Sequence, residues 1–176
     1  NKYEDAIKDY DKAIEIDPRN YIAFNNRGAS KHILNQYEDA IKDYDQAIKL
    51  NPNDILYYQN RGLSKYYLDR YEDAIKDYDR AIKLNPNEFL SFYYKGKLNR
   101  LLKKYKEAIK DYDQAIKLNP KDADSFGERG VSKSCLDREK EAIKDYIQAI
   151  KLNPEYSYYW DLAYSYMNLE KYEEAL

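Results

Sequence analysis

The most constraining feature of this sequence is a period of 34 residues. Proline recurs at that interval along the chain, at Pro18, Pro52, Pro86, Pro120 and Pro154. Three further series keep the same spacing: a glycine (Gly28, Gly62, Gly96, Gly130), an alanine (Ala40, Ala74, Ala108, Ala142) and a tyrosine (Tyr44, Tyr78, Tyr112, Tyr146). Several residue types that share one period indicate an array of similar structural units, each of which contacts mainly its neighbours.

Each unit contains two helical patterns. Within residues 37–50, apolar side chains recur three and four positions apart, which is the spacing of one face of an α-helix. Glu38 and Asp39 lie in the first turn and Lys49 in the last, as the helix dipole favours. This helix is expected to end at Asn51, because a residue before proline is pushed out of the α conformation.

The other helix of the unit is predicted over residues 55–68 and contains Gly62. Glycine inside a helix costs about 1 kcal/mol relative to alanine. A glycine repeated at this position therefore indicates that two backbones approach closely. We expect Gly62 to face Ala74 of the following helix.

The unit resembles the tetratricopeptide repeat, because an aromatic residue, Gly, Tyr, Ala, a second aromatic residue, Ala and Pro stand at set offsets within 34 residues. The resemblance covers essentially the whole chain. It implies an all-α fold, a right-handed superhelical solenoid of antiparallel helix pairs. First helices would line a concave groove, and second helices would form the outer layer.

In the family's register the chain is a single domain, 1–176, in which a lone second helix (about 3–16, within 1–20) precedes the full units. Full units are expected at 21–54, 55–88, 89–122 and 123–155. A partial unit follows at 156–176, one residue short after Pro154. Its residues at matching offsets are Leu162, Ala163, Tyr166, Tyr172 and Ala175.

The first helices vary more than the second helices. Residues 37–52 and 71–86 differ only at Gln46 versus Arg80, whereas residues 21–34 and 89–102 agree at three of 14 positions. This contrast is expected if the groove binds something irregular. Duplication followed by drift, with tighter packing limits on the second helix, explains it equally well.

The resemblance places the second, fifth, ninth and twelfth residues of each unit on the groove, and the sixth beside it. The candidate peptide-binding residues at these positions are Asn25, Asn26, Gln59, Asn60, Tyr66, Tyr93, Lys97 and Arg100. Amides can hydrogen-bond a peptide backbone, tyrosines supply rigid contact area, and the two cations can meet a carboxylate. A solvated helix face is the alternative. A chaperone clamp is not expected, since Asn25 and Ala29 stand where the carboxylate-binding members carry Lys and Asn.

The chain departs from the family at the seventh position of each unit, where leucine is usual. The residues there are basic: Arg27, Arg61, Lys95 and Arg129. The second helices carry acids with the same period: Asp9, Asp43, Asp77, Asp111 and Asp145. We predict structural ion pairs between the two series, repeated along the stack. A basic stripe for an acidic ligand is the alternative.

The residue content does not favour an enzyme, and neither a cofactor nor a metal is expected. His32 is the only histidine and Cys135 the only cysteine, so a His-based metal cluster and an internal disulfide are excluded. The glycines lie singly within helices, unlike a phosphate-binding loop. With a formal net charge of −2 there is no basic surplus for nucleic acid. No apolar run of about 18 residues predicts a membrane span.

The fourth unit is the least regular. Cys135, Glu139 and Ile147 replace its usual residues, and Gly127 lies inside its first helix. These changes indicate either local loosening or a specialised contact.

We therefore expect a non-catalytic scaffold or adaptor that binds a protein or peptide in its groove. One alternative is a structural module that self-associates end to end through the apolar face of its N-terminal helix, at about residues 3–16. Another is an engineered repeat protein, given the nearly identical second helices. Richness in Asn, Lys, Ile and Tyr is typical of an AT-rich bacterial genome. The chain opens within a repeat and reads as a fragment, and a cytoplasmic location is expected.

Overall fold

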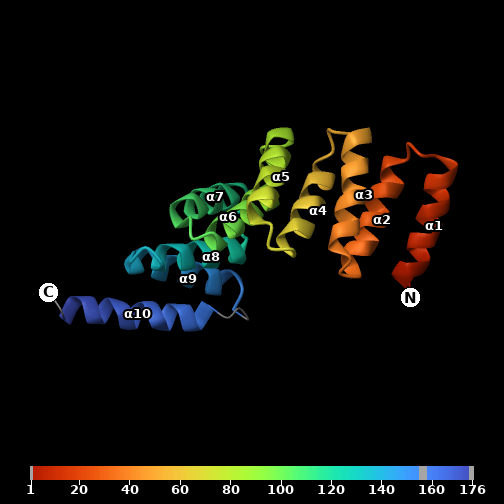
Figure 1. The fold of residues 1–176 in the computed structure, drawn as a ribbon. Coiled ribbons are helices and arrows are strands. Elements are labelled where there is room, and N and C mark those ends of the chain that lie inside the picture. The colour runs from red at the N-terminus through yellow and green to blue at the C-terminus, as the bar shows by residue number, and fades with distance from the viewer. Residues whose placement is uncertain (1, 155–157, 175–176) are drawn as a thin grey trace. The chain divides into compact units, whose positions relative to one another are not determined.

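The computed structural model describes residues 2–154 and 158–174, which form ten α-helices and no strand (Figure 1). The helices are α1 (Lys2–Ile16), α2 (Tyr21–Ile33), α3 (Tyr37–Leu50), α4 (Ile55–Tyr66), α5 (Tyr71–Leu84), α6 (Phe89–Leu101), α7 (Tyr105–Leu118), α8 (Ala123–Ser134), α9 (Glu139–Leu152) and α10 (Tyr158–Glu174). The predicted all-α class is confirmed. The helix predicted over 37–50 is α3, whereas α4 ends two residues before the predicted 68.

Contacts divide the chain into two compact units, Asn1–Pro86 and Asn87–Leu176. We call them the N-terminal unit, with α1–α5, and the C-terminal unit, with α6–α10. In each unit every helix packs on the next along the chain. In addition α2 contacts α4, and α8 contacts both α6 and α10. The first helices of each unit therefore contact one another, and each also packs against the second helices next to it along the chain.

The turn inside each helix pair depends on one residue in the left-handed conformation. Asn35, Asp69, Lys103 and Asp137 have φ of 60°, 56°, 57° and 57°. Asn and Asp adopt this region more readily than most residues, and a left-handed residue commonly ends a helix. The second helix of the pair can therefore start within two residues and run back along the first.

The joint between pairs depends on the Asn–Pro dipeptide. Asn51 and Asn85 end their helices in extended backbone, as a following proline requires. The next helix then begins with a side-chain cap: Asp54 accepts a hydrogen bond from the Leu56 amide (3.0 Å), and Asp122 from the Ser125 amide (2.9 Å).

The core of each pair is a tyrosine packed on a glycine. The tyrosines of the 34-residue series, Tyr44, Tyr78, Tyr112 and Tyr146, are the largest fully buried side chains. A Cβ added to Gly62 would lie 3.0 Å from Tyr78 Cε2, and one added to Gly130 would lie 2.7 Å from Tyr146 Cε1. The expected partner of Gly62, Ala74, was therefore wrong. The glycine makes room for a ring one helical turn further along the next helix.

The last helix differs from the register expected for the partial unit. In that register Tyr172 belongs to a second helix, but α10 runs unbroken from Tyr158 to Glu174. Glu170 stands where the other units carry their left-handed residue, and glutamate is a good helix former. Tyr156 and Ala175 lie outside the described residues. Among the described helices, none is long and apolar enough to cross a membrane.

Candidate peptide-binding surface

Exposed apolar side chains recur along the first helices. Ile22, Leu56 and Leu90 share the second position of their units and are 55%, 53% and 41% exposed. On α10 the exposed side chains that follow at intervals of four and three residues are Trp160, Tyr164 and Met167. Single exposed apolar residues are ordinary, but residues that recur at one repeat position or along one helix face are candidates for a contact surface within their own unit. We call the three α10 residues the α10 stripe.

The α10 stripe was not predicted, although the sequence contained its signal. Once the residue missing after Pro154 is allowed for, Trp160, Tyr164 and Met167 occupy the fifth, ninth and twelfth positions of their unit. These are the positions that the family register assigns to the groove.

The predicted groove amides of the N-terminal unit hydrogen-bond one another. Asn60 Nδ2 donates to Asn25 Oδ1 (3.1 Å), and Asn25 Nδ2 donates to Asn26 Oδ1 (3.1 Å). The first of these bonds joins α2 to α4 across the boundary between two repeats. The structure thus brings three predicted residues together, half-buried, while Gln59 and Tyr66 lie half-buried on the same helix α4.

His32 lies in an aromatic cluster beside these amides. Its ring centroid is 5.2 Å from that of Tyr37 and 5.4 Å from that of Tyr67, both edge-on, and these two tyrosines stack at 5.0 Å. Its Nδ1 lies 2.8 Å from Ser64 Oγ. A pocket of about 190 Å³ borders the ring, and burial lowers the pKa of His32.

The lowered pKa of His32 predicts a pH dependence of stability. The unfolded chain takes up a proton near the ordinary pKa of 6.5, and the folded chain only at lower pH. The free energy of unfolding should therefore be unaffected above that value and fall as the pH drops from 6.5 through the lowered pKa. Urea unfolding between pH 7 and pH 5 checks this. His32→Gln should flatten the His32 part of the profile, and an identical slope in the variant would contradict the assignment.

The predicted cations of the C-terminal unit have partners inside the protein. Arg100 Nε lies 2.6 Å from Glu128 Oε2, an ion pair between α6 and α8. Tyr93 packs its ring 6.1 Å from that of Tyr112, and burial raises its pKa. Lys97 is half-buried on the same helix. The carboxylate that Arg100 meets therefore belongs to this chain.

The seventh-position arginines bridge two second helices each. Arg27 Nη1 lies 2.6 Å from Asp11 of α1, and its Nη2 lies 2.5 Å from Asp43 of α3. Arg61 makes the same pair of contacts with Asp45 (2.6 Å) and Asp77 (2.5 Å). Arg129 does so with Asp113 (2.6 Å) and Asp145 (2.6 Å). We call these three sets of contacts the arginine bridges.

The two acids of each bridge differ in burial. The side chain of Asp77 is 4% exposed and that of Asp45 is 49% exposed. The buried acid also accepts from the basic residue four positions after the arginine: Lys65 Nζ lies 2.7 Å from Asp77. In the third full unit Lys95 lies 3.6 Å from Asp111, which also accepts from Asn99 (2.7 Å). A buried carboxylate is thus surrounded by donors.

The arginine bridges differ from the predicted ladder in one acid. Asp9 is not a partner of Arg27. It is exposed, and its carboxylate lies 4.0 Å from Lys12 of the same helix. Asp11, two residues later, contacts Arg27 instead. The exposed acids Asp11, Asp45 and Asp113 were overlooked, although they repeat with the same period.

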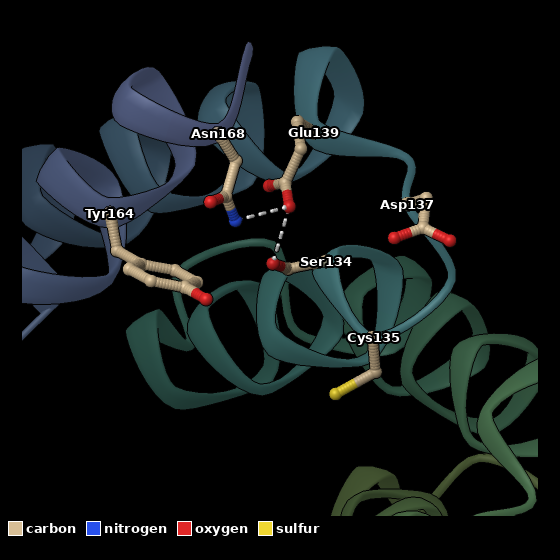
Figure 2. A pocket seen from close by; sticks show the side chains of 6 residues that line it. All are labelled: Ser134, Cys135, Asp137, Glu139, Tyr164 and Asn168. Carbon is tan, nitrogen blue, oxygen red and sulfur yellow. Dashed lines mark hydrogen bonds between the residues drawn. The ribbon is translucent and has the colours of Figure 1, made fainter. Parts of the chain in front are cut away.

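A pocket of about 350 Å³ lies between α8, α9 and α10 in the C-terminal unit (Figure 2). Its lining residues are Ser134, Cys135, Asp137, Glu139, Tyr164 and Asn168. Glu139 is 4% exposed, and its Oε1 accepts from Ser134 Oγ (3.0 Å) and Asn168 Nδ2 (3.2 Å). Its Oε2 is buried and has no hydrogen-bond partner among the described residues.

The pocket exists because a ring is missing. The residue at the position of Glu139 is tyrosine in the three preceding units: Tyr37, Tyr71 and Tyr105. In the N-terminal unit Tyr37 stacks on Tyr67, at the position that Asn168 holds in α10. A smaller carboxylate and amide here replace two stacked rings, which leaves space and a polar wall. A buried oxygen without a partner costs about 1–3 kcal/mol.

The described residues contain no group of three or more His, Cys, Asp or Glu side chains arranged to hold a metal ion. Cys135 is a free thiol at the surface.

Comparison with known proteins shows the family to which the repeats belong. Tetratricopeptide repeat models match residues 21–54, 60–123 and 123–156, and a TPR repeat model matches residues 1–32. No protein of curated function matches the sequence.

Among solved structures, MamA is similar with a TM-score of 0.83 at 22% identity, over 87% of this chain and 90% of that one. MamA 41-end from Desulfovibrio magneticus RS-1 has a TM-score of 0.81 at 22% identity, over 88% of each chain. YrrB, described as a TPR protein with an unusual peptide-binding site, has 0.79 at 22% identity, over 90% and 81%. These likenesses show the helix-pair fold, and with the family matches they identify the chain as a member of the tetratricopeptide repeat family.

Proposed function

We propose that this chain is a non-catalytic scaffold that binds a peptide, or an extended segment of a partner protein, along its first helices. The family supports a role in protein interaction. YrrB, which shares the fold, is described as having a peptide-binding site. The likeness to YrrB is a likeness of fold. Support for peptide binding by this chain therefore comes from its own exposed side chains.

The observation that carries the proposal is the exposure of apolar side chains at groove positions. Trp160 is 84% exposed on α10, and Leu56 is 53% exposed on α4. Tryptophan and tyrosine supply large contact areas at a low cost in side-chain entropy, and they are enriched among the residues that dominate binding. Half-buried amides such as Asn60 border this surface in the N-terminal unit.

The proposal can be tested with peptides selected against the 176-residue chain from a random library, with affinities measured by calorimetry. Trp160→Ala is expected to weaken binding about tenfold or more, since a buried tryptophan anchor is worth about 2 kcal/mol or more. Leu56→Ala should weaken peptides that engage the N-terminal unit. Ile147→Ala, on the second helix α9 and 47% exposed, is the matched control and should leave affinity unchanged.

Two outcomes would overturn the proposal. One is a selection that yields no saturable binder. The other is a set of peptides that bind the Trp160, Leu56 and Ile147 variants as tightly as the unchanged chain. Light scattering over a concentration series separates the competing self-assembly role, in which the apparent mass would rise with concentration.

A further inference from the structure

We propose that the pocket between α8, α9 and α10 receives the side chain of an arginine in the bound peptide, with Glu139 as its anionic partner. This inference deepens the proposed function and rests on it. Ser134 and Tyr164, two of the lining residues, stand at the twelfth and ninth positions of their units, where the groove is expected. The pocket therefore opens beside the surface on which a peptide would lie.

The pocket presents a carboxylate that is only half satisfied. Ser134 and Asn168 both donate to Oε1 of Glu139, while the buried Oε2 has no partner among the described residues. Figure 2 shows both hydrogen bonds ending on the same carboxylate oxygen. Because Oε2 is buried, an incoming N–H donor would first have to displace part of the pocket lining, and it would then satisfy this oxygen without breaking either existing bond.

The electrostatics of the pocket favour a cation. Asp137 also lines this pocket, so two of its six described lining residues are acidic. The described residues that line the pocket include neither lysine nor arginine.

Arginine fits this pocket better than a metal ion or lysine. Calcium requires six to eight oxygen ligands. One of the two carboxylate oxygens of Glu139, Oε1, is already engaged by two hydrogen bonds, which leaves it less able to bind a metal ion. A guanidinium is planar, carries five donors and is more weakly hydrated than an ammonium, so it enters a buried site more readily. Tyr164 lines the pocket and offers a ring on which a planar cation can stack.

The test is a nuclear magnetic resonance titration of the 176-residue chain with N-acetyl-arginine-N-methylamide. We expect saturable shifts in the Asn168 side-chain amide and in the backbone amides of residues 134–139. The citrulline analogue has nearly the same shape without the charge and should give no saturable shift. The lysine analogue should bind more weakly than the arginine analogue.

Three variants complete the test. Glu139→Gln keeps the shape of the side chain and should weaken binding about tenfold or more. Glu139→Tyr restores the residue of the other repeats, fills the pocket and should abolish the shifts in a folded protein. Glu141→Gln changes a carboxylate on the same helix that is 48% exposed and paired with Arg138, and should leave binding unchanged. Circular dichroism of each variant reports folding.

The absence of saturable shifts in the unchanged chain would overturn the inference, as would equal affinity for Glu139→Gln. Equal affinity for the lysine analogue would overturn the assignment to a guanidinium. Failure of this pocket is distinguishable from failure of the scaffold. If selected peptides bind Glu139→Tyr undiminished, the scaffold function stands without this subsite. If the arginine analogue binds but no peptide does, the pocket is a guanidinium site, and both the scaffold function and the role of the pocket in peptide binding fall.

Discussion

Replacing Asp77 with alanine is expected to lower the free energy of unfolding by about 3–5 kcal/mol, because it leaves two half-buried cations without their shared partner. Asp77 accepts from Arg61 and from Lys65, at 2.5 and 2.7 Å, and its side chain is 4% exposed. Once the carboxylate is removed, water cannot reach the largely buried Arg61 and Lys65 side chains well enough to replace it. Urea unfolding followed by circular dichroism measures the change.

The same arginine provides the control for this prediction. Asp45 contacts Arg61 at 2.6 Å, but its side chain is 49% exposed. Asp45→Ala should therefore cost no more than about 1 kcal/mol, as exposed ion pairs do. If the Asp45 and Asp77 variants lost equal stability, burial of the carboxylate would not determine how much an arginine bridge contributes to the free energy of unfolding.

Gly127→Ala is expected to destabilise the C-terminal unit by about 1–3 kcal/mol through overpacking, although alanine is the better helix former. A Cβ at this position would lie 1.9 Å from Cζ of Tyr158. The Tyr158 ring is 7% exposed and packs 6.1 Å from the ring of Tyr146, so it has little room to move away. Thermal unfolding followed by circular dichroism measures the loss.

A double variant isolates the cause. In a Tyr158→Ala background the ring is absent, so Gly127→Ala should be neutral or stabilising there. Gly62→Ala is the milder comparison, since its Cβ would lie 3.0 Å from Tyr78. Effects of Gly127→Ala that are the same with and without the Tyr158 ring would show that the clash is not responsible.

Much of the fold could be predicted from the sequence because the repeats report on one another. The apolar spacing within 37–50 and the proline at 52 determine both ends of α3. The direction in which a side chain points across a helix pair could not be predicted in the same way. Gly62 faces Tyr78 rather than Ala74, because spacing along a helix does not show how far two helices are displaced along their axes.

Prediction of the site was weaker because its features depend on departures from the repeat. The position of Glu139 was recognised as irregular, but the pocket also requires Asn168, across a joint that is one residue short. The same joint brings Tyr158 over Gly127. For the arginine bridges, sequence reasoning assigned one acid to each arginine, whereas a long guanidinium reaches acids on both neighbouring helices.

The arginine bridges constrain how a chain of this kind can change length over evolution. Each bridge draws its two acids and its arginine from three successive helices, and the spacing between arginine and each acid is 16 residues. Gain or loss of 34 residues by unequal crossing-over keeps every bridge intact wherever the breakpoints fall. A substitution in one repeat, by contrast, leaves a charge in the next without its counterpart. Where the series stops, both sides have changed: Ile147 and Leu162 stand where an exposed aspartate and an arginine would follow.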